Sequence, residues 1–157
     1  HVSTLIIRML DAHYRLVLNQ QRTFEPGGNI PRTVRYIDEH YDLPLTLDQL
    51  AQTAYLSKFY FLRAFRKSMG MTPMDYLSAV RVHHAQNLLL TTGLTVEEIA
   101  LRTGYSGSKN LIRQFSQIVG MTPGQYRKNA DFHNRRFYYA GKFMQDFSVP
   151  GAEFPPG

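Results

Sequence analysis

Apolar residues recur every three or four positions through most of the chain, and no segment alternates apolar and polar residues as a β-strand does. From residue 31 to 128 this spacing predicts a series of amphipathic helices. It also predicts a separate helix over residues 3–21, with Ser3 as its N-cap. The apolar stripe of that separate helix consists of Ile6, Leu10, Tyr14 and Val17. The pattern therefore favours an all-α fold.

Two changes of character divide the chain into three parts. The cluster Pro26-Gly27-Gly28-Asn29 interrupts the helical spacing and separates an N-terminal helix and linker (1–25) from a helix-dense domain (30–129). After residue 129 aromatic, basic and small residues follow one another without helical spacing, and the final Pro-Pro-Gly excludes regular helix there. We expect residues 130–157 to form a mostly irregular, aromatic-rich C-terminal tail.

The helix-dense domain contains an internal repeat. Residues 62–76 match residues 112–126, 50 positions later, and residues 46–51 match residues 95–100, 49 positions later. The difference of one residue falls between the matched stretches, where a turn accommodates it. Seven pairs are identical in the longer match: Arg63/Arg113, Phe65/Phe115, Gly70/Gly120, Met71/Met121, Thr72/Thr122, Pro73/Pro123 and Tyr76/Tyr126. The repeat predicts two copies of one structural unit.

Each copy carries the signals of two short helices joined by a turn, which is the arrangement of a helix-turn-helix unit. Thr46 and Thr95 are expected N-caps, and their capping-box partners follow three residues later. These partners are Gln49 and Glu98. In the second copy Gly104 is expected to take the left-handed conformation of the turn. The first copy has Ala54-Tyr55-Leu56 there and no glycine.

The second helix of each copy ends at a glycine, and a further helix follows it. These second helices are expected to start near Ser57 and Gly107 and to end at Gly70 and Gly120. Threonine and proline then open the next helix in both copies, as N-cap and first helical residue. In the first copy this next helix spans residues 73–90, about 25 Å at 1.5 Å per residue. It would link the two units rigidly.

Composition narrows the chemistry further. The net charge is +6 with neutral histidines, which favours binding to polyanions such as nucleic acid. The absence of cysteine excludes a disulfide scaffold, a cysteine nucleophile and a thiolate metal site. No apolar run approaches the roughly 18 residues of a membrane span. No nucleophile motif or phosphate-binding glycine loop is present, so we expect a cytoplasmic protein that is neither an enzyme nor dependent on a cofactor. The start at His1, without Met or a signal-peptide pattern, favours a fragment of a longer protein.

Taken together, these signals resemble the DNA-binding domain of AraC/XylS-type bacterial transcription regulators. The resemblance covers residues 31–128 and rests on Leu47, Ala51, Ser57, Phe65, Gly70, Tyr76, Leu77, Arg81, Ala85, Leu88, Leu89, Ile99, Ala100, Gly104, Tyr105, Arg113, Phe115, Gly120, Thr122, Pro123, Tyr126 and Arg127. It implies two helix-turn-helix subdomains joined by a linker helix. It also implies that both recognition helices enter successive major grooves on one face of an asymmetric DNA site, and it favours activation over repression.

The resemblance also assigns base-contacting positions on the two recognition helices, residues 57–67 and 107–115. They are Phe59, Tyr60, Leu62 and Arg63 on the first helix, and Ser108, Lys109, Asn110 and Arg113 on the second. Arginine can donate two hydrogen bonds to guanine, and asparagine can bond adenine in the same bidentate way. Phe59 and Leu62 depart from the family's usual polar residues, because apolar groups contact thymine methyls without hydrogen bonds. We expect the first unit to depend more on shape and the second more on hydrogen bonds.

Polar and cationic residues beside these helices are candidates for phosphate contacts, which fix position without reading sequence. They are Ser57, Lys58, Arg66, Lys67, Arg127 and Lys128. The backbone amides that follow Thr72 and Thr122 are expected to contribute, because amides at a helix start attract anions.

Other polar residues have structural interpretations. We expect Arg81, on the linker helix, to pair with a carboxylate such as Asp48 or Glu98 rather than with DNA. His83 and His84 point about 100° apart on a helix, so they do not converge on a metal ion.

The two ends of the chain leave alternatives open. The helix over residues 3–21 belongs either to an upstream effector or dimerisation domain, which we slightly favour, or to the DNA-binding domain on which it packs. In the tail, either Arg135, Arg136 and Lys142 extend the DNA-binding surface, or the aromatic residues pack on this domain or on a neighbouring molecule. Double-stranded DNA is the expected partner, followed by RNA polymerase and by a second copy bound through the N-terminal helix or the tail.

The function predicted from the sequence is sequence-specific DNA binding by a transcription regulator, with activation favoured. One alternative is a helical protein-interaction module that keeps the helix-turn-helix fold. Another is a DNA-modifying enzyme, but the absence of cysteine removes alkyl transfer and no other chemistry is visible.

Overall fold

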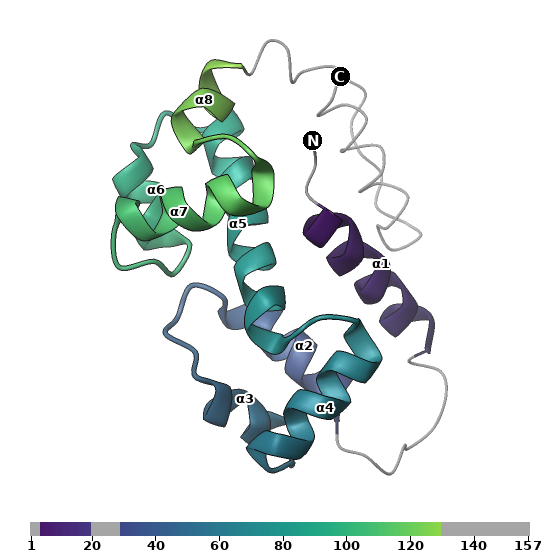
Figure 1. Ribbon diagram of the computed structural model, residues 1–157. Helices are drawn as coiled ribbons and strands as arrows, with labels where there is room; N and C mark the ends of the chain where they lie inside the picture. Colours follow the sequence, from purple (N-terminus) through teal and green to yellow (C-terminus); the bar gives the residue numbers. More distant parts are fainter. Residues whose placement is uncertain (1–3, 20–28, 130–157) are drawn as a thin grey trace.

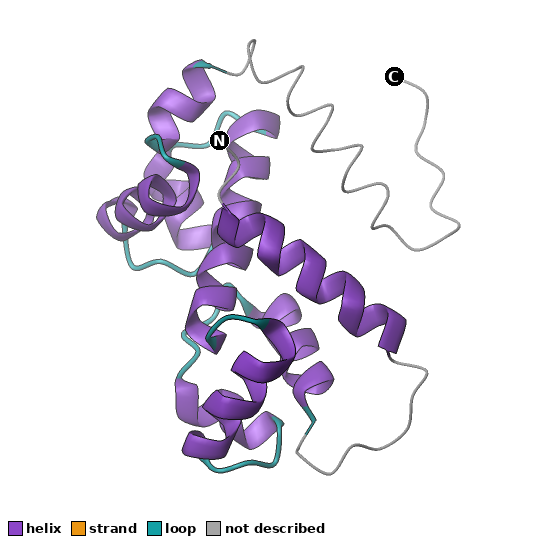
Figure 2. Cartoon of the chain, turned by 45° about the vertical axis from the view of Figure 1, so that its right-hand side comes forward, coloured by secondary structure: helices purple, strands orange, loops and turns teal. Residues whose placement is uncertain are grey.

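A computed structural model of the chain describes residues 4–19 and 29–129, and within these ranges all regular structure is helical (Figures 1 and 2). The helices are α1 (Thr4–Asn19), α2 (Ile30–His40), α3 (Leu47–Thr53), α4 (Lys58–Met69), α5 (Pro73–Thr91), α6 (Val96–Arg102), α7 (Ser108–Val119) and α8 (Pro123–Lys128). The all-α prediction is confirmed for this part of the chain. Ser3, the linker cluster before Asn29 and the tail 130–157 lie outside the described residues. No helix in the described ranges has the length and apolar character that crossing a bilayer demands.

Two helical units sit at the two ends of α5 (Figure 1). Helices α2, α3 and α4 pack together at one end, α6, α7 and α8 pack together at the other, and α5 contacts both groups. Each unit has its own apolar core, with Phe61 and Phe65 fully buried in one and Leu111 and Phe115 fully buried in the other. The two helix-turn-helix units and the linker helix predicted from the repeat are confirmed.

The helix starts lie where the sequence places them. Thr46 and Thr95 each accept a hydrogen bond from the backbone amide three residues later, and both capping boxes are closed. Thr72 and Thr122 cap α5 and α8 in the same way, with proline in the first turn of each helix. Each such cap satisfies backbone amides that would otherwise lack a partner, which is why these threonines define the boundaries.

Both turns use the left-handed backbone conformation, although only one of them has a glycine. Gly104 has a φ of 93° in the second unit, as predicted. In the first unit Tyr55 takes this role with a φ of 57°, and it is the single non-glycine residue with a positive φ among those described. A left-handed residue with a Cβ costs roughly 1–2 kcal/mol. Arg32 of α2 donates a hydrogen bond to the Tyr55 hydroxyl and lies over its ring, which holds this turn in place.

Helix α1 packs on the helix-turn-helix units of its own chain, as in the second of the two alternatives given for this helix. Ile6, Met9 and Ala12 are buried against this domain. Of the predicted stripe, Ile6 is buried and Leu10 is half-buried, while the side chains of Tyr14 and Val17 lie outside the described residues. The described part of the α1 stripe is therefore occupied within the chain.

Candidate nucleic-acid interface

The second helix of each unit is anchored by large apolar residues on one face, and this anchoring fixes what the other face presents. Phe61 and Phe65 of α4 are fully buried, as are Leu111 and Phe115 of α7. Because these pairs are four residues apart, they lie on one side of the helix, and the residues between them point outward. The exposed sides of α4 and α7 are therefore defined by the repeat itself.

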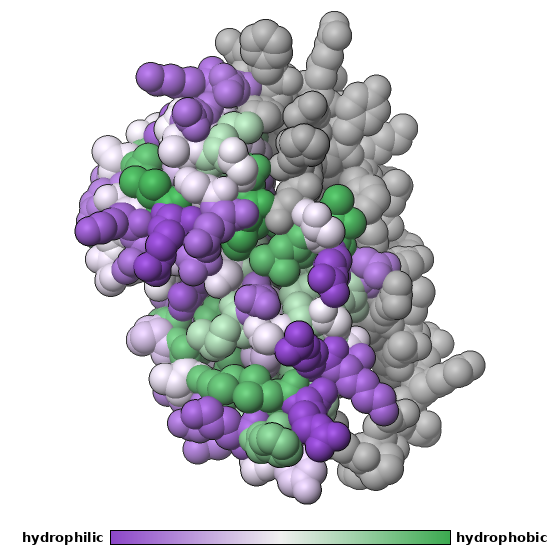
Figure 3. All heavy atoms as spheres, in the orientation of Figure 1, coloured by the Kyte–Doolittle hydropathy of each residue, from purple (hydrophilic) through white to green (hydrophobic). Residues whose placement is uncertain are grey.

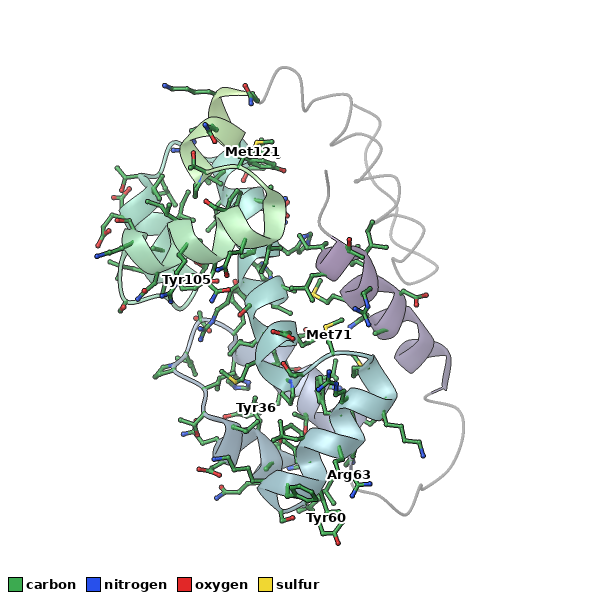
Figure 4. The ribbon with its side chains drawn as sticks, in the orientation of Figure 1. Tyr36, Tyr60, Arg63, Met71, Tyr105 and Met121 are labelled. Carbon is green, nitrogen blue, oxygen red and sulfur yellow. The ribbon has the colours of Figure 1, made fainter. Side chains whose placement is uncertain are left out.

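On α4 the exposed side combines aromatic and cationic groups. Phe59 and Tyr60 are each 64% exposed, a high value for aromatic side chains of a soluble fold. The Arg63 guanidinium lies 5.7 Å from the centre of the Phe59 ring, a cation–π distance that limits where the guanidinium can point. Figure 4 shows Tyr60 and Arg63 projecting together from this end of the molecule. Leu62 is only partly exposed, so of the four predicted base contacts it reaches least into solvent.

An open groove runs along α4 beside these residues. It is lined by Leu56, Tyr60, Arg63, Ala64, Arg66 and Lys67. Three of the lining residues are cationic, which suits a polyanion such as the phosphate backbone. Figure 3 shows hydrophilic side chains gathered over α4 and over α7 on one face of the molecule.

On α7 the polar groups at the helix start are already ordered. The Asn110 side-chain amide donates to the Ser106 hydroxyl at 2.9 Å, and Asn110 and Ser108 are both half-buried. Lys109 and Arg113 are exposed. The second unit thus presents two exposed cations, Lys109 and Arg113, beside an oriented amide.

Glu97 of α6 holds the start of α7, a contact between two helices that the sequence does not indicate. Its carboxylate accepts a 2.8 Å hydrogen bond from the Ser108 backbone amide, and this bond is the main reason why the pKa of Glu97 is lowered. Gly107, the N-cap of α7, has no side chain to cap the helix, so Glu97 from α6 supplies the acceptor. The equivalent residue in the first unit, Asp48, lies 3.9 Å from Lys58 at the start of α4. Asp48 and Glu97 are 49 residues apart, which is the offset of the repeat, and this spacing is the sequence signal that relates them.

The structure divides the predicted phosphate contacts into two groups. Ser57, Lys58, Arg66, Lys67 and Lys128 are exposed. Arg127 is half-buried and donates hydrogen bonds to the carbonyl oxygens of Leu89 and Thr92, at 3.1 and 3.2 Å. Its guanidinium fastens α8 to the end of α5, so Arg127 has a structural role in addition to the phosphate contact predicted for it.

Arg81 has the structural role predicted for it but not the predicted partners. Its Nε donates to the Tyr41 carbonyl at 2.7 Å and its Nη2 to the Leu43 carbonyl at 2.8 Å. The guanidinium also lies over the Tyr105 ring, 5.6 Å from its centre, and burial lowers the pKa of Arg81. Pairing with Asp48 or Glu98 was wrong: Asp48 lies near Lys58, and Glu98 closes its own capping box. Arg81 therefore joins the loop of the first unit to the turn of the second.

The two adjacent histidines of α5 are packing residues in the structure. Their rings meet edge-on with centres 5.9 Å apart, and His84 stacks on Tyr41 at 3.9 Å. Burial, followed by the neighbouring His84, lowers the pKa of His83 to about 4. His83 is therefore neutral at pH 7.

Two equivalent units, each with a capped first helix, a left-handed turn and an exposed second helix, define a double helix-turn-helix DNA-binding protein. A family model described as a helix-turn-helix domain matches residues 50–129, about half of the chain. The chain belongs to the AraC/XylS family of transcription regulators and is a DNA-binding domain of that family.

Three comparisons illustrate this relationship. The melibiose operon regulatory protein of Escherichia coli K12 is 32% identical over 108 residues, which are 69% of this chain and 36% of that protein. The DNA-binding domain of AdpA, solved in complex with a target DNA, is 34% identical with a TM-score of 0.62 over 68% of this chain and 95% of that one. A probable AraC family transcriptional regulator from Rhodopseudomonas palustris is 29% identical with a TM-score of 0.58, over 64% of this chain and 95% of that one. The chain thus spans about a third of the melibiose regulator.

Proposed function

We propose that the chain binds promoter DNA sequence-specifically by placing α4 and α7 in successive major grooves on one face of the duplex. The observation that carries this proposal is the equivalent placement of Arg63 and Arg113, each exposed on a helix whose opposite face is buried. Helix α5 has 19 residues, a length of about 28 Å, which is comparable to the ~34 Å between successive major grooves.

The two units are proposed to read DNA in different ways. Phe59, Tyr60 and Leu62 of α4 would contact thymine methyls and the shape of the groove, with Arg63 as the hydrogen-bonding residue. In the second unit the bases would be read by the polar groups of α7. They are Ser108, Lys109, Asn110 and Arg113.

Phosphate contacts would fix the position of both helices on the duplex. The exposed candidates are Ser57, Lys58, Arg66, Lys67 and Lys128. At the starts of α5 and α8 the side chains of Thr72 and Thr122 accept from the amides of Asp75 and Gln125, so the amides of Met74 and Gly124 would supply the anion contact there.

The regulator to which this domain belongs is proposed to act on transcription through contact with RNA polymerase, with activation favoured. The support is the family, in which the melibiose operon regulatory protein and a lactose operon transcription activator of Staphylococcus xylosus are relatives.

Gel-shift titration with a DNA sequence selected by the chain from a random pool tests the proposal. If the four exposed lysines and arginines contact phosphates, the logarithm of the association constant should fall with the logarithm of the salt concentration with a slope of about −4. The selected sequence should also outcompete random DNA. Random DNA that competes equally well, or no binding at about 0.15 M salt, would favour the alternative of a helical protein-interaction module.

A further inference from the structure

We propose that α1 is a positioning helix that fixes the two helix-turn-helix units relative to each other, and so sets the spacing of the two halves of the DNA site. The matched family region begins at residue 50, so α1 lies outside it. The effect on site spacing rests on the proposed function, because spacing matters only where both α4 and α7 bind DNA. The bracing of the two units does not depend on DNA.

Helix α1 contributes to both apolar cores. Ile6 is buried in the core of the second unit, whereas Met9 and Ala12 are buried in the core of the first. Leu5 and Leu10 pack against both cores. Helix α1 accordingly contacts α4, α5 and α7, and Figure 2 shows it crossing beside the junction of the units. A helix with residues buried in both cores resists rotation of one unit against the other.

A hydrogen bond ties α1 directly to the end of the first recognition helix. Arg8 Nη2 donates at 2.9 Å to the carbonyl oxygen of Gly70, the left-handed C-cap of α4. Carbonyl groups at a helix end lack partners within the helix and carry partial negative charge. A guanidinium there is favoured both by the hydrogen bond it donates and by its positive charge. A shift of α1 along its axis would break this bond.

A second polar contact ties α1 to α2 and α5. The Tyr76 hydroxyl donates to Asp38 at 2.9 Å, and His13 Nδ1 lies 3.3 Å from that hydroxyl and 3.5 Å from the other Asp38 oxygen. Asp38 is half-buried, and desolvation by burial is the main cause of its raised pKa. Because buried polar groups cost free energy when unpaired, this trio favours the docked position of α1.

The other connection between the units lies on a different side of α5. Arg81 joins the Tyr41 loop to Tyr105, and it follows Tyr76 by five residues, about 140° around the helix. With Arg81 on one side and α1 on another, the units are held at two places beyond α5 itself. Removing the α1 contacts leaves the Arg81 connection among the described residues, and rotation of the units about α5 becomes easier.

The absence of cysteine allows a direct measurement of the distance between the units. Gln52→Cys on α3 and Leu101→Cys on α6 are exposed positions 49 residues apart, equivalent in the two copies of the repeat. Spin labels at these two cysteines report the distribution of inter-unit distances by pulsed electron paramagnetic resonance, on the full 157-residue chain without DNA. The distributions of Ile6→Asp and of the matched control Ile7→Asp are then compared, since Ile6 is 3% and Ile7 47% exposed.

The distribution of the labelled parent and of Ile7→Asp is expected to be narrow. Ile6→Asp should broaden it by about twofold, because a unit released from α1 samples several orientations. Ile6→Ala, which leaves a cavity rather than a buried charge, is expected to broaden it in the same direction while circular dichroism shows intact helices. Unchanged widths in both Ile6 variants would overturn the proposal.

A DNA experiment then tests the effect on spacing. One base pair inserted between the two halves of a selected site rotates them by about 34° relative to each other. The parent chain should lose about tenfold in affinity on this insertion and Ile6→Asp less than about threefold, because a loosely held pair adapts. Equal losses would overturn the role in spacing. Broadening in Ile6→Asp without any preferred DNA sequence would instead contradict the proposed function and leave the bracing role supported.

Discussion

At the scale of single residues, Arg113 offers the sharpest test of base reading. It is exposed on α7, and its equivalent in the first unit is Arg63. Arg113→Ala should cost about 1–3 kcal/mol of binding to the selected DNA and relax the preference at one base position. Fluorescence anisotropy with the selected DNA and its single-base variants measures both effects.

The matched control for Arg113→Ala is Gln117→Ala, an exposed residue one turn later on α7. Its affinity should stay close to that of the parent chain. If Arg113→Ala lost the same affinity on selected and random DNA, the residue would contact phosphate rather than a base.

His83 predicts a dependence of stability on pH. Its pKa is about 4 in the folded chain, below the ordinary value near 6.5, so the unfolded chain takes up the proton first as the pH falls. The stabilisation from neutral His83 is therefore fully present above pH 6.5. As the pH falls from about 6.5 to 4, protonation of the unfolded chain lowers the free energy of unfolding by roughly 3 kcal/mol in all. Urea unfolding of the parent and of His83→Gln at pH 7.5, 6 and 5 measures it.

The difference in unfolding free energy between parent and His83→Gln should shrink steadily from pH 6.5 downward. A difference that stays constant across this range would show that His83 does not take up its proton on unfolding. The comparison between two variants cancels the contributions of other groups, such as Asp38 with its raised pKa.

At the scale of helices and turns, alanine substitutions at three glycines distinguish the cost of backbone strain from the cost of a steric clash. Gly104 has a φ of 93°, and a Cβ there would lie 2.5 Å from the Tyr41 carbonyl oxygen and 2.7 Å from Arg81 Nε. Gly120 has a φ of 87° but no atom within 4 Å of such a Cβ. Gly120→Ala should therefore cost about 1–2 kcal/mol of stability through strain alone, and Gly104→Ala at least about 3 kcal/mol.

Gly93→Ala serves as the control for both changes, since Gly93 has neither a positive φ nor an atom within reach of a Cβ. Its effect on thermal unfolding should be close to zero or slightly stabilising, by less than about 1 kcal/mol. Equal costs for Gly104→Ala and Gly120→Ala would mean that the close approach of the two units at Gly104 does not exist in solution.

The helices were predictable because their signals are local. A threonine cap, its partner three residues later and a terminal glycine act on neighbouring backbone groups, so Thr46, Thr95, Gly70 and Gly120 could be read in the sequence. The left-handed Tyr55 could not, because a residue other than glycine gives no local signal of a positive φ, and the Arg32 that contacts it comes from another helix.

The partners of several polar side chains were beyond sequence reasoning for the same physical reason. Arg81, Arg127 and Glu97 bond backbone atoms that lie 11 to 40 residues away along the chain. Backbone acceptors and donors are present at every residue, so the sequence does not indicate which of them a side chain will bond. The partners expected from the sequence were therefore carboxylates for Arg81 and phosphate for Arg127. The exposed faces of α4 and α7 could be predicted, because helical spacing alone separates Phe61 from Tyr60.

At the scale of the whole molecule, the internal repeat made the architecture predictable. Two copies of one unit need a connection, and the helical spacing of residues 73–90 predicted a long helix there. The position of α1 was not predictable, since an apolar stripe indicates that a face is buried but not what covers it. In the structure the described part of that stripe fits the cores of both units.

The two recognition helices of one chain, α4 and α7, are proposed to read two successive major grooves. Hydroxyl-radical footprinting of the selected DNA, repeated with Arg63→Ala and Arg113→Ala, tests this proposal most directly. We expect two protected segments on one face of the duplex, about 10–10.5 base pairs apart, with each substitution weakening a different one. Loss of the same segment in both variants, or a single protected segment with the parent chain, would contradict it.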